Sequence, residues 1–392
     1  MKNKSGNLIF CQAQVPYDNL GDLVITKVLL MNLRNYGHII VNIKGVPEWY
    51  CQQLELTAEE KASSYKLPFP ILVLLFRLQT LINSNANIYL LMRPGHVFGS
   101  GLSNSIKMFM SAIYCFVMKI LGVRICRFGT SIGPFSSLMQ IGEKWKSNAM
   151  YFYSARDTIS ANYAKKIGID KVEIFPDMAW LIKKQNANDN LAWLMQTPNA
   201  NKQPIHVDGD YVVFSFRDTF REFNNPEYKN NLCATLDSIV QLVCVEWAKT
   251  LVIAHQVDWD YEFCKWLSDR YQNSCKIVFI ERYIDSQYMY DLYSGAFMVF
   301  SNRLHVLLLA MLCGALSMAV VERASEHKIT GIFSDAGLSQ LIVDIDRGSS
   351  AVDILPGIAA DADRIKAEIA LAFERNRNHG ESLLKRVMTG EI

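Results

Sequence analysis

The chain of 392 residues lacks an excess of charge of either sign, because 40 Lys and Arg are balanced by 38 Asp and Glu. A formal net charge of +2 gives no support for a nucleic-acid partner. The nine cysteines form no CxxC pair and no Cys/His cluster at metal-ligand spacing. Their odd number and scatter indicate free thiols in a reducing compartment, so we expect no disulfides and no metal site.

Long apolar runs are also missing. The two most apolar segments, 67–82 and 108–118, fall short of the roughly 20 apolar residues that a membrane span requires. We expect each to be a buried helix. The alternative is that one of them lies on a membrane surface with its flanking Lys and Arg facing the headgroups. The N-terminus has no apolar core or cleavage-like site of a secretory signal, so we expect a cytoplasmic protein.

Half of the residues are hydrophobic, and this length favours two domains over one. Strand-like apolar runs alternate with helical spacing along the chain, which predicts α/β architecture with parallel, doubly wound sheets. Between residues 183 and 210 the composition changes to Asn, Gln, Lys, Pro and Asp. We therefore expect an N-terminal Rossmann-like domain at 1–185, a second at 205–358 and a C-terminal helical segment at 359–392.

The first predicted domain has strands followed by polar or glycine-containing loops. The strands are expected at 7–11, 38–43, 88–92, 119–127, 150–154 and 172–175. Asp157 or Thr158 can cap a helix that Gly168 ends. Loops are expected at DNLGD (18–22), at RPGHVFGSG (93–101) and at FGTSIGPF (128–135), and neither a P-loop nor GxGxxG is present. Asp22 can cap a helix or accept a substrate hydroxyl, and both interpretations stay open.

The second predicted domain repeats the alternation. Strands are expected at 211–216, 251–255, 276–280, 296–300, 316–320 and 341–345. Helices are expected at 231–248, 261–271 and 285–293, with a short one at 191–195 in the linker and an amphipathic stretch at 359–387.

The segment 300–315, FSNRLHVLLLAMLCGA, dominates the functional interpretation. It places Ser301, Asn302, Arg303 and His305 between an apolar strand and a buried helix. At such a corner the helix N-terminus offers free N–H groups and a positive dipole end, which suits a small anionic substrate. Taken alone, an arginine beside a histidine is also compatible with a satisfied surface pair. Similar strand-end positions, and hence the same crevice, are predicted for Arg217 and His255.

Several short strings together resemble the polysaccharide pyruvyl transferase family. They are DNLGD (18–22), RPG (93–95), GTSIGPF (129–135), ARDTIS (155–160), PDMA (176–179), SNRLH (301–305) and EHK with Gly331 (326–331). The resemblance implies two facing Rossmann-like domains similar to the GT-B architecture. It also implies transfer of a pyruvyl group from phosphoenolpyruvate to two hydroxyls of a sugar, giving a cyclic ketal, with no further cofactor.

The resemblance further implies that Arg303, His305 and Arg217 handle phosphoenolpyruvate. Two arginines can each form a fork with one of its two anions, the phosphate and the carboxylate. His305 would be the general acid/base, because imidazole exchanges protons near neutral pH. Further donor contacts are expected from the rest of the central motif and from two other side chains, namely Ser301, Asn302, Leu304, Lys328 and His255.

Acceptor contacts are expected from the first domain. The candidates are Asn19, Asp22, Arg93, Gly95 and His96. Many family members have a run of glycines where this chain has Pro94, Gly95 and His96, so the acceptor stays unassigned. An acceptor in a surface polysaccharide or its lipid-linked precursor would bring the protein to the inner face of the cytoplasmic membrane as a peripheral protein.

Two other interpretations remain open. A GT-B-type nucleotide-sugar glycosyltransferase would use Arg303 to bind a diphosphate, but 301–311 offers no acidic residue for a ribose. A non-catalytic binding protein would be favoured by loss of the arginine or histidine, and both are present. Asp258 and Asp260 form a DxD pattern, which we discount as a metal motif because Asp260 suits a helix cap and the proposed chemistry needs no metal.

Overall fold

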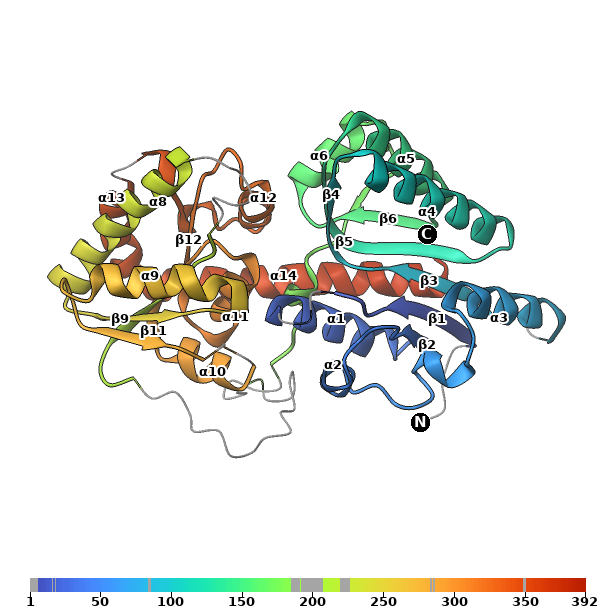
Figure 1. Ribbon diagram of the computed structural model, residues 1–392, viewed down its shortest axis with the longest axis horizontal. Helices are drawn as coiled ribbons and strands as arrows, with labels where there is room; N and C mark the ends of the chain where they lie inside the picture. Colours follow the sequence, from blue (N-terminus) through green and yellow to red (C-terminus); the bar gives the residue numbers. More distant parts are fainter. Residues whose placement is uncertain are drawn as a thin grey trace. The chain divides into compact units, whose positions relative to one another are not determined.

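The computed structural model describes residues 6–15, 17, 19–83, 86–184, 191, 207–218, 226–282, 284, 286–347 and 350–392. By its internal contacts the chain divides into two units, shown in Figure 1. The first comprises Met1–Tyr17, Asp22–Ile182 and Asn376–Ile392, and the second comprises Asp18–Gly21 and Lys183–Arg375. The domain limits expected from composition, 1–185, 205–358 and 359–392, stay a prediction.

The first unit is built on a parallel sheet in the order β2-β1-β3-β5-β6-β7, with β4 paired to β5. Its strands are β1 (Asn7–Gln12), β2 (Gly37–Asn42), β3 (Ile88–Met92), β4 (Gly95–Gly99), β5 (Arg124–Phe135), β6 (Phe152–Ala155) and β7 (Glu173–Ile174). The buried, nearly continuous apolar runs of β1, β3 and β5 are typical of parallel strands that are covered on both faces.

Helices cover both faces of this sheet. They are α1 (Leu20–Leu33), α2 (Glu48–Gln53), α3 (Phe69–Asn83), α4 (Leu102–Ile120), α5 (Ser137–Ala149), α6 (Thr158–Lys166) and the C-terminal part of α14 (Ala362–Thr389). In Figure 1, α4 and α5 lie side by side on one side of β5, and α14 runs along the other. The hydroxyl of Tyr89 in β3 donates to the carbonyls of Val387 and Met388, which attaches the end of α14 to the sheet.

The second unit contains a six-stranded parallel sheet in the order β10-β9-β8-β11-β12-β13. Its strands are β8 (Tyr211–Ser215), β9 (Thr250–Ala254), β10 (Ile277–Ile280), β11 (Ala296–Ser301), β12 (Leu316–Val321) and β13 (Ile342–Asp344). Counted within this unit, the order is 3-2-1-4-5-6, the Rossmann order. The chain therefore reverses its direction of winding between β8 and β11, where a doubly wound sheet opens a crevice at its strand ends.

The helices of the second unit connect these strands. They are α8 (Pro226–Ile239) with a π-helical turn (Val240–Glu246), α9 (Tyr261–Tyr271), α10 (Ser286–Ser294), α11 (Leu304–Cys313), α12 (His327–Asp335), α13 (Ser350–Ala360) and the first part of α14. The predicted helix at 261–271 coincides with α9. Of the expected helix at 191–195, all but Leu191 lies outside the described residues.

Two of the predicted loops are strands in the structure. Strand β5 continues through 128–135, where a glycine-rich loop was expected, and Gly95 and His96 lie in β4. Gly129 and Gly133 adopt φ values of 55° and 80°, and the β5 pairings shift register nearby. Glycine tolerates these angles, so the strand bends without ending.

The prediction that 67–82 and 108–118 are buried helices is wrong in part. Both segments are helical, in α3 and α4, but each leaves one row of apolar side chains exposed to solvent. Apolar side chains all round a helix normally indicate burial on all sides. No helix among the described residues is long and apolar enough to cross a membrane.

Candidate functional site

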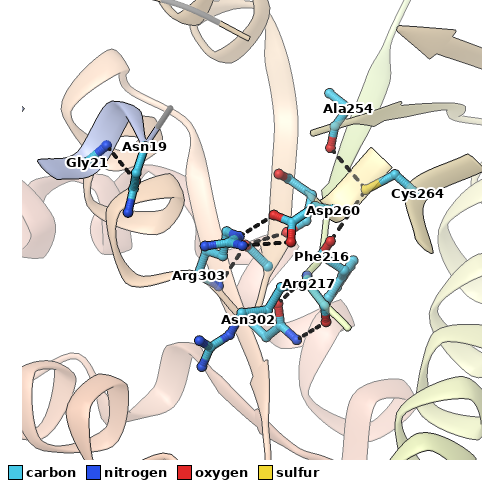
Figure 2. Close-up of polar contacts among 11 residues, drawn as sticks. Asn19, Gly21, Phe216, Arg217, Ala254, Asp260, Cys264, Asn302 and Arg303 are labelled. Atoms are coloured by element: carbon cyan, nitrogen blue, oxygen red, sulfur yellow. Dashed lines mark hydrogen bonds and ion pairs between the residues drawn. The ribbon is translucent and has the colours of Figure 1, made fainter. Parts of the chain in front are cut away.

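The site candidates of the second unit lie at the carboxyl ends of β8 and β11. Asn302 follows β11, and its side-chain amide joins the two strand ends: Oδ1 accepts from the backbone N–H of Arg217 (2.9 Å), and Nδ2 donates to the Arg217 carbonyl (3.0 Å). Ser301 Oγ donates to the Ser215 carbonyl (2.5 Å) and accepts from the Arg303 N–H (2.9 Å). Figure 2 shows Asn302, Arg217 and Arg303 gathered at this point.

Arg303 forms a two-pronged ion pair with Asp260. Its Nη2 lies 2.6 Å from Oδ1, and its Nε bonds Oδ2. Asp260 is fully buried, so the pair fixes the guanidinium in one orientation. Asp260 holds the N-cap position of α9, as expected, but its side chain makes no cap hydrogen bond and bonds Arg303 instead. The pairing was not predicted because Asp260 and Arg303 are 43 residues apart.

Arg217 is paired with a second buried carboxylate. Its Nη2 lies 2.7 Å from Oε1 of Glu326, which directly precedes α12. Arg217 and Asp260 also line a cavity of about 360 Å³. Its other lining residues are Asp218, Lys229, Trp259, Glu262, Phe263 and Trp266. The cavity thus has a wall of cationic, aromatic and acidic side chains around Arg217 and the carboxylate partner of Arg303.

His305 is the second residue of α11 and lies against Gly21. A Cβ atom added to Gly21 would be only 2.1 Å from Nδ1 of His305, so only glycine fits there. The N–H of Gly21 donates to Oδ1 of Asn19 (3.0 Å), and both residues belong to the second unit. Gly21 and His305, which are more than 280 residues apart in the sequence, therefore meet at this point.

His255 and Lys328 are placed differently from the arginines. His255 follows β9 and is buried, with its ring edge-on to Tyr261 at 5.3 Å. Burial lowers the pKa of the His255 imidazole from its ordinary value of 6.5, and the Asp258 carboxylate opposes this shift. Lys328 is half-buried in the first turn of α12. Neither side chain lines the cavity beside Arg217.

A buried thiol, that of Cys264, lies beside the end of β8. Burial raises the pKa of Cys264 to about 12. Its Sγ–H lies within hydrogen-bonding distance of the carbonyls of Phe216 (3.4 Å) and Ala254 (3.5 Å), as Figure 2 shows. Because a thiolate is the reactive form, Cys264 has a structural role.

The remaining acceptor candidates lie in the first unit. Asp22 is in the first turn of α1, so it does not hold the position before this helix, which Asn19 of the second unit occupies. Arg93 Nη1 donates to the Gln14 carbonyl (2.5 Å). His96 Nε2 lies 2.7 Å from the Gly133 carbonyl, and Gly95 has a φ of 117°.

Sequence reasoning missed Glu326, Lys229 and the two tryptophans of the cavity. Glu326 belongs to the EHK string, so the motif was noticed, but its ion pair with Arg217 was not predicted. Lys229 and Trp266 lie on helical segments whose spacing gives no sign that they face a cavity. Asp260 was noticed within its DxD pattern but was given another role.

The family model that describes polysaccharide pyruvyl transferase matches residues 19–315, about three quarters of the chain. This chain belongs to the polysaccharide pyruvyl transferase family. The match confirms the family suggested by the short motifs from DNLGD to SNRLH. No protein with a curated description matches the sequence. Membership supports a transferase that attaches pyruvyl groups to polysaccharide.

Solved structures similar to this pyruvyl transferase family member show its fold class. UDP-GlcNAc 2-epimerase from Neisseria meningitidis, bound to UDP-GlcNAc, has a TM-score of 0.55 and 12% identity, with 98% of this chain and 99% of that chain covered. UDP-GlcNAc 2-epimerase from Methanocaldococcus jannaschii has a TM-score of 0.51 and 14% identity, with coverages of 89% and 92%. The prediction of two Rossmann-like α/β domains of GT-B type is confirmed.

Proposed function

We propose that this protein transfers a pyruvyl group from phosphoenolpyruvate to two hydroxyls of one sugar. In this reaction the methylene carbon of phosphoenolpyruvate gains a proton and becomes a methyl group. The adjacent carbon bonds both sugar oxygens, and its bond to the phosphate oxygen breaks. Of the two hydroxyl protons that are lost, one balances the proton gained by the methylene carbon and the other leaves on inorganic phosphate. The products are a cyclic ketal that carries a carboxylate, and inorganic phosphate. No cofactor is needed, since the donor brings both its activated carbon and its leaving group.

The observation that carries this proposal is the pair of arginines at neighbouring strand ends. Arg217 follows β8 and Arg303 follows β11, at the reversal point of a Rossmann sheet. Their backbones are joined through Asn302. Phosphoenolpyruvate carries two separate anionic groups, and guanidinium groups recognise both carboxylate and phosphate through paired N–H donors. Two held arginines therefore suit this donor.

The carboxylate partners of both arginines are compatible with this role. A guanidinium has five N–H donors, and Asp260 uses only the Nε and Nη2 side of Arg303. Glu326 accepts from Nη2 of Arg217. These pairs orient the arginines before a ligand arrives, which reduces the entropy lost on binding. They also neutralise part of the positive charge, so Lys229, which lines the cavity together with Arg217, would strengthen phosphate binding.

His305 is the residue to which we assign proton transfer. It begins α11 two residues after Arg303, and Gly21 lies against its ring. Contact with the backbone at Gly21 restricts the ring, which general acid/base catalysis requires.

Asn19 would contact the acceptor beside His305, and Asp22, Arg93, Gly95 and His96 would supply the other acceptor contacts. Ser301, Asn302 and Leu304 would position the donor side, whereas the burial of His255 favours a structural role for it.

The acceptor we propose is a sugar of a surface polysaccharide or of its lipid-linked precursor. Membership of a family that acts on polysaccharide supports the saccharide. A lipid-linked precursor would make the protein a cytoplasmic enzyme that works at the inner face of the membrane.

A nucleotide-sugar glycosyltransferase is the second candidate, because UDP-GlcNAc is bound by the similar epimerase from Neisseria meningitidis. Under this alternative, Arg303 would bind a diphosphate. Both acidic residues beside the arginines, Asp260 and Glu326, already accept hydrogen bonds from them, so they are less suited to holding a ribose.

Calorimetric titration with phosphoenolpyruvate and, separately, with UDP-GlcNAc distinguishes the two candidates. We expect binding of phosphoenolpyruvate that is lost in Arg217→Gln. The matched control is Arg270→Gln, which removes an exposed arginine of α9 that is paired with Asp237. Binding of UDP-GlcNAc with none of phosphoenolpyruvate would overturn the proposal and favour the glycosyltransferase.

A further inference from the structure

Helix α4 has two apolar faces. One face packs in the core of the first unit and consists of Ser105, Met108, Ala112, Cys115 and Met118. The opposite face is exposed and consists of Leu102, Ile106, Met110, Ile113, Val117 and Ile120. Steps of three and four residues align these six side chains along a helix about 28 Å long. The exposure is extreme for Leu102 (68%) and Ile120 (83%).

Neighbouring elements extend this exposed face. Phe98 in β4 is 63% exposed and lies four residues before the first residue of α4. Helix α5 packs along α4, with Trp145 edge-on to Phe109 at 5.7 Å, and it exposes a row of its own. The combined apolar surface consists of Phe98, Leu102, Ile106, Met110, Ile113, Val117, Ile120, Leu138, Ile141 and Trp145. Exposed apolar side chains gathered on two packed helices indicate an interaction site.

The chain segment that carries the apolar surface has charged residues almost entirely of one sign. In a chain that is nearly neutral overall, residues 61–156 contain a single acidic residue, Glu143. Glu143 is buried and paired with Arg127, so it contributes no negative charge to the surface. The same stretch contains eleven basic residues, and three of them are exposed on α4 and α5, namely Lys107, Lys119 and Lys144.

We propose that the apolar surface of α4, α5 and Phe98 docks on the anionic face of a lipid bilayer. Apolar side chains would enter the boundary between headgroups and acyl chains, and the lysines would contact anionic headgroups. Trp145 has the amphipathic ring that favours this depth. A symmetric pairing with a second copy is disfavoured, because it would bring the same basic side chains of both copies together.

This inference rests on the proposed function in one respect, the acceptor. His96, a proposed acceptor contact, is exposed and lies beside Phe98, with ring centroids 4.5 Å apart. Docking through Phe98 would therefore bring His96 to the membrane surface. The substrate class that fits is a saccharide carried on a membrane lipid, and not a free soluble sugar.

Sedimentation with lipid vesicles tests the docking. The full-length protein is mixed with vesicles of phosphatidylcholine alone or of phosphatidylcholine with phosphatidylglycerol. We expect binding to the anionic vesicles that weakens with salt, and a loss of about tenfold or more in partitioning for Ile106→Glu/Ile113→Glu. The matched control, Leu371→Glu, changes an exposed leucine of α14 outside the surface and should bind like the wild type.

Two further measurements keep the test decisive. Lys107→Gln/Lys144→Gln should weaken binding to the anionic vesicles while leaving thermal unfolding unchanged, since both side chains are exposed. No vesicle binding, together with a dimer that Ile106→Glu/Ile113→Glu dissociates in ultracentrifugation, would assign the surface to a second copy and overturn the proposal. Phosphoenolpyruvate affinity should be equal in all these variants, so failure of the docking does not count against the reaction, and the reverse also holds.

Discussion

The side chain of Asn302 holds the backbone of Arg217 by both of its polar atoms, with hydrogen bonds of 2.9 Å and 3.0 Å. The two residues follow strands β11 and β8 and are 85 residues apart in sequence. Asn302 is fully buried. Because Asn302 is also next to Arg303 in the sequence, it fixes the backbone positions of the two proposed donor-binding arginines relative to each other.

Replacing Asn302 by Ala should lower the free energy of unfolding by about 1–3 kcal/mol, because two buried backbone groups lose their partners. The affinity for phosphoenolpyruvate should fall by about tenfold, since Arg217 would no longer be fixed beside Arg303. Denaturant unfolding and calorimetry measure the two effects. If Asn302→Ala loses stability but keeps its full affinity for phosphoenolpyruvate, Asn302 contributes only to the fold and not to donor binding.

Arg303→Ala should be strongly destabilising as well as defective in donor binding. It leaves the carboxylate of Asp260 buried without its countercharge, which costs about 3–5 kcal/mol. Asp260→Asn in the same chain should recover most of this stability without restoring affinity for phosphoenolpyruvate. The double variant thus separates the structural role of the ion pair from ligand binding. Recovery of both properties would contradict a direct contact between Arg303 and the donor.

Gly21→Ala should displace the ring of His305, because the new methyl carbon would lie 2.1 Å from Nδ1. We expect pyruvyl transfer to fall by about tenfold or more, with a smaller effect on phosphoenolpyruvate affinity. Gly357→Ala in α13 is the matched control, since a methyl group there meets no atom within 4 Å. Unchanged transfer in Gly21→Ala would argue against a precisely held histidine.

The buried His255 should make stability depend on pH. Its pKa is lowered in the folded state by burial, so the unfolded chain binds a proton more readily. The contribution is fully present above the unfolded pKa of about 6.5 and is lost as the pH falls through the lower folded value. Unfolding free energies measured across this range should vary less in His255→Gln than in the wild type. The control is His327→Gln, which replaces an exposed histidine. The account would be contradicted if the unfolding free energy of His255→Gln depended on pH as strongly as that of the wild type. It would also be contradicted if His327→Gln reduced this pH dependence by the same amount.

The sequence predicted the two parallel sheets and the strand-end position of Arg217 and Arg303, because alternation of apolar strands and helices is a local pattern. It did not predict the partners of the arginines. Asp260 and Glu326 reach them through the fold, from positions 43 and 109 residues away. Nor could it show that β5 continues through its glycines, since glycine is equally typical of a loop and of a bent strand.

Helix α4 illustrates another limit of sequence analysis. Apolar residues on both sides of the helix predicted burial on both sides. Only the structure shows that one side, with Ile106 and Ile113, has no cover from the described residues of the chain. Hydropathy records which side chains avoid water but not which surface covers them.

The most direct test of the proposed reaction is NMR of phosphoenolpyruvate labelled with carbon-13 at its central carbon, incubated with the protein and a panel of lipid-linked and simple pyranosides. We predict a ketal carbon signal that grows with one of these acceptors, in step with release of inorganic phosphate, and its absence with folded His305→Ala. Equal ketal formation by His305→Ala would contradict the assignment of proton transfer. Cleavage of UDP-GlcNAc in the same mixtures, with phosphoenolpyruvate unchanged, would contradict the reaction itself.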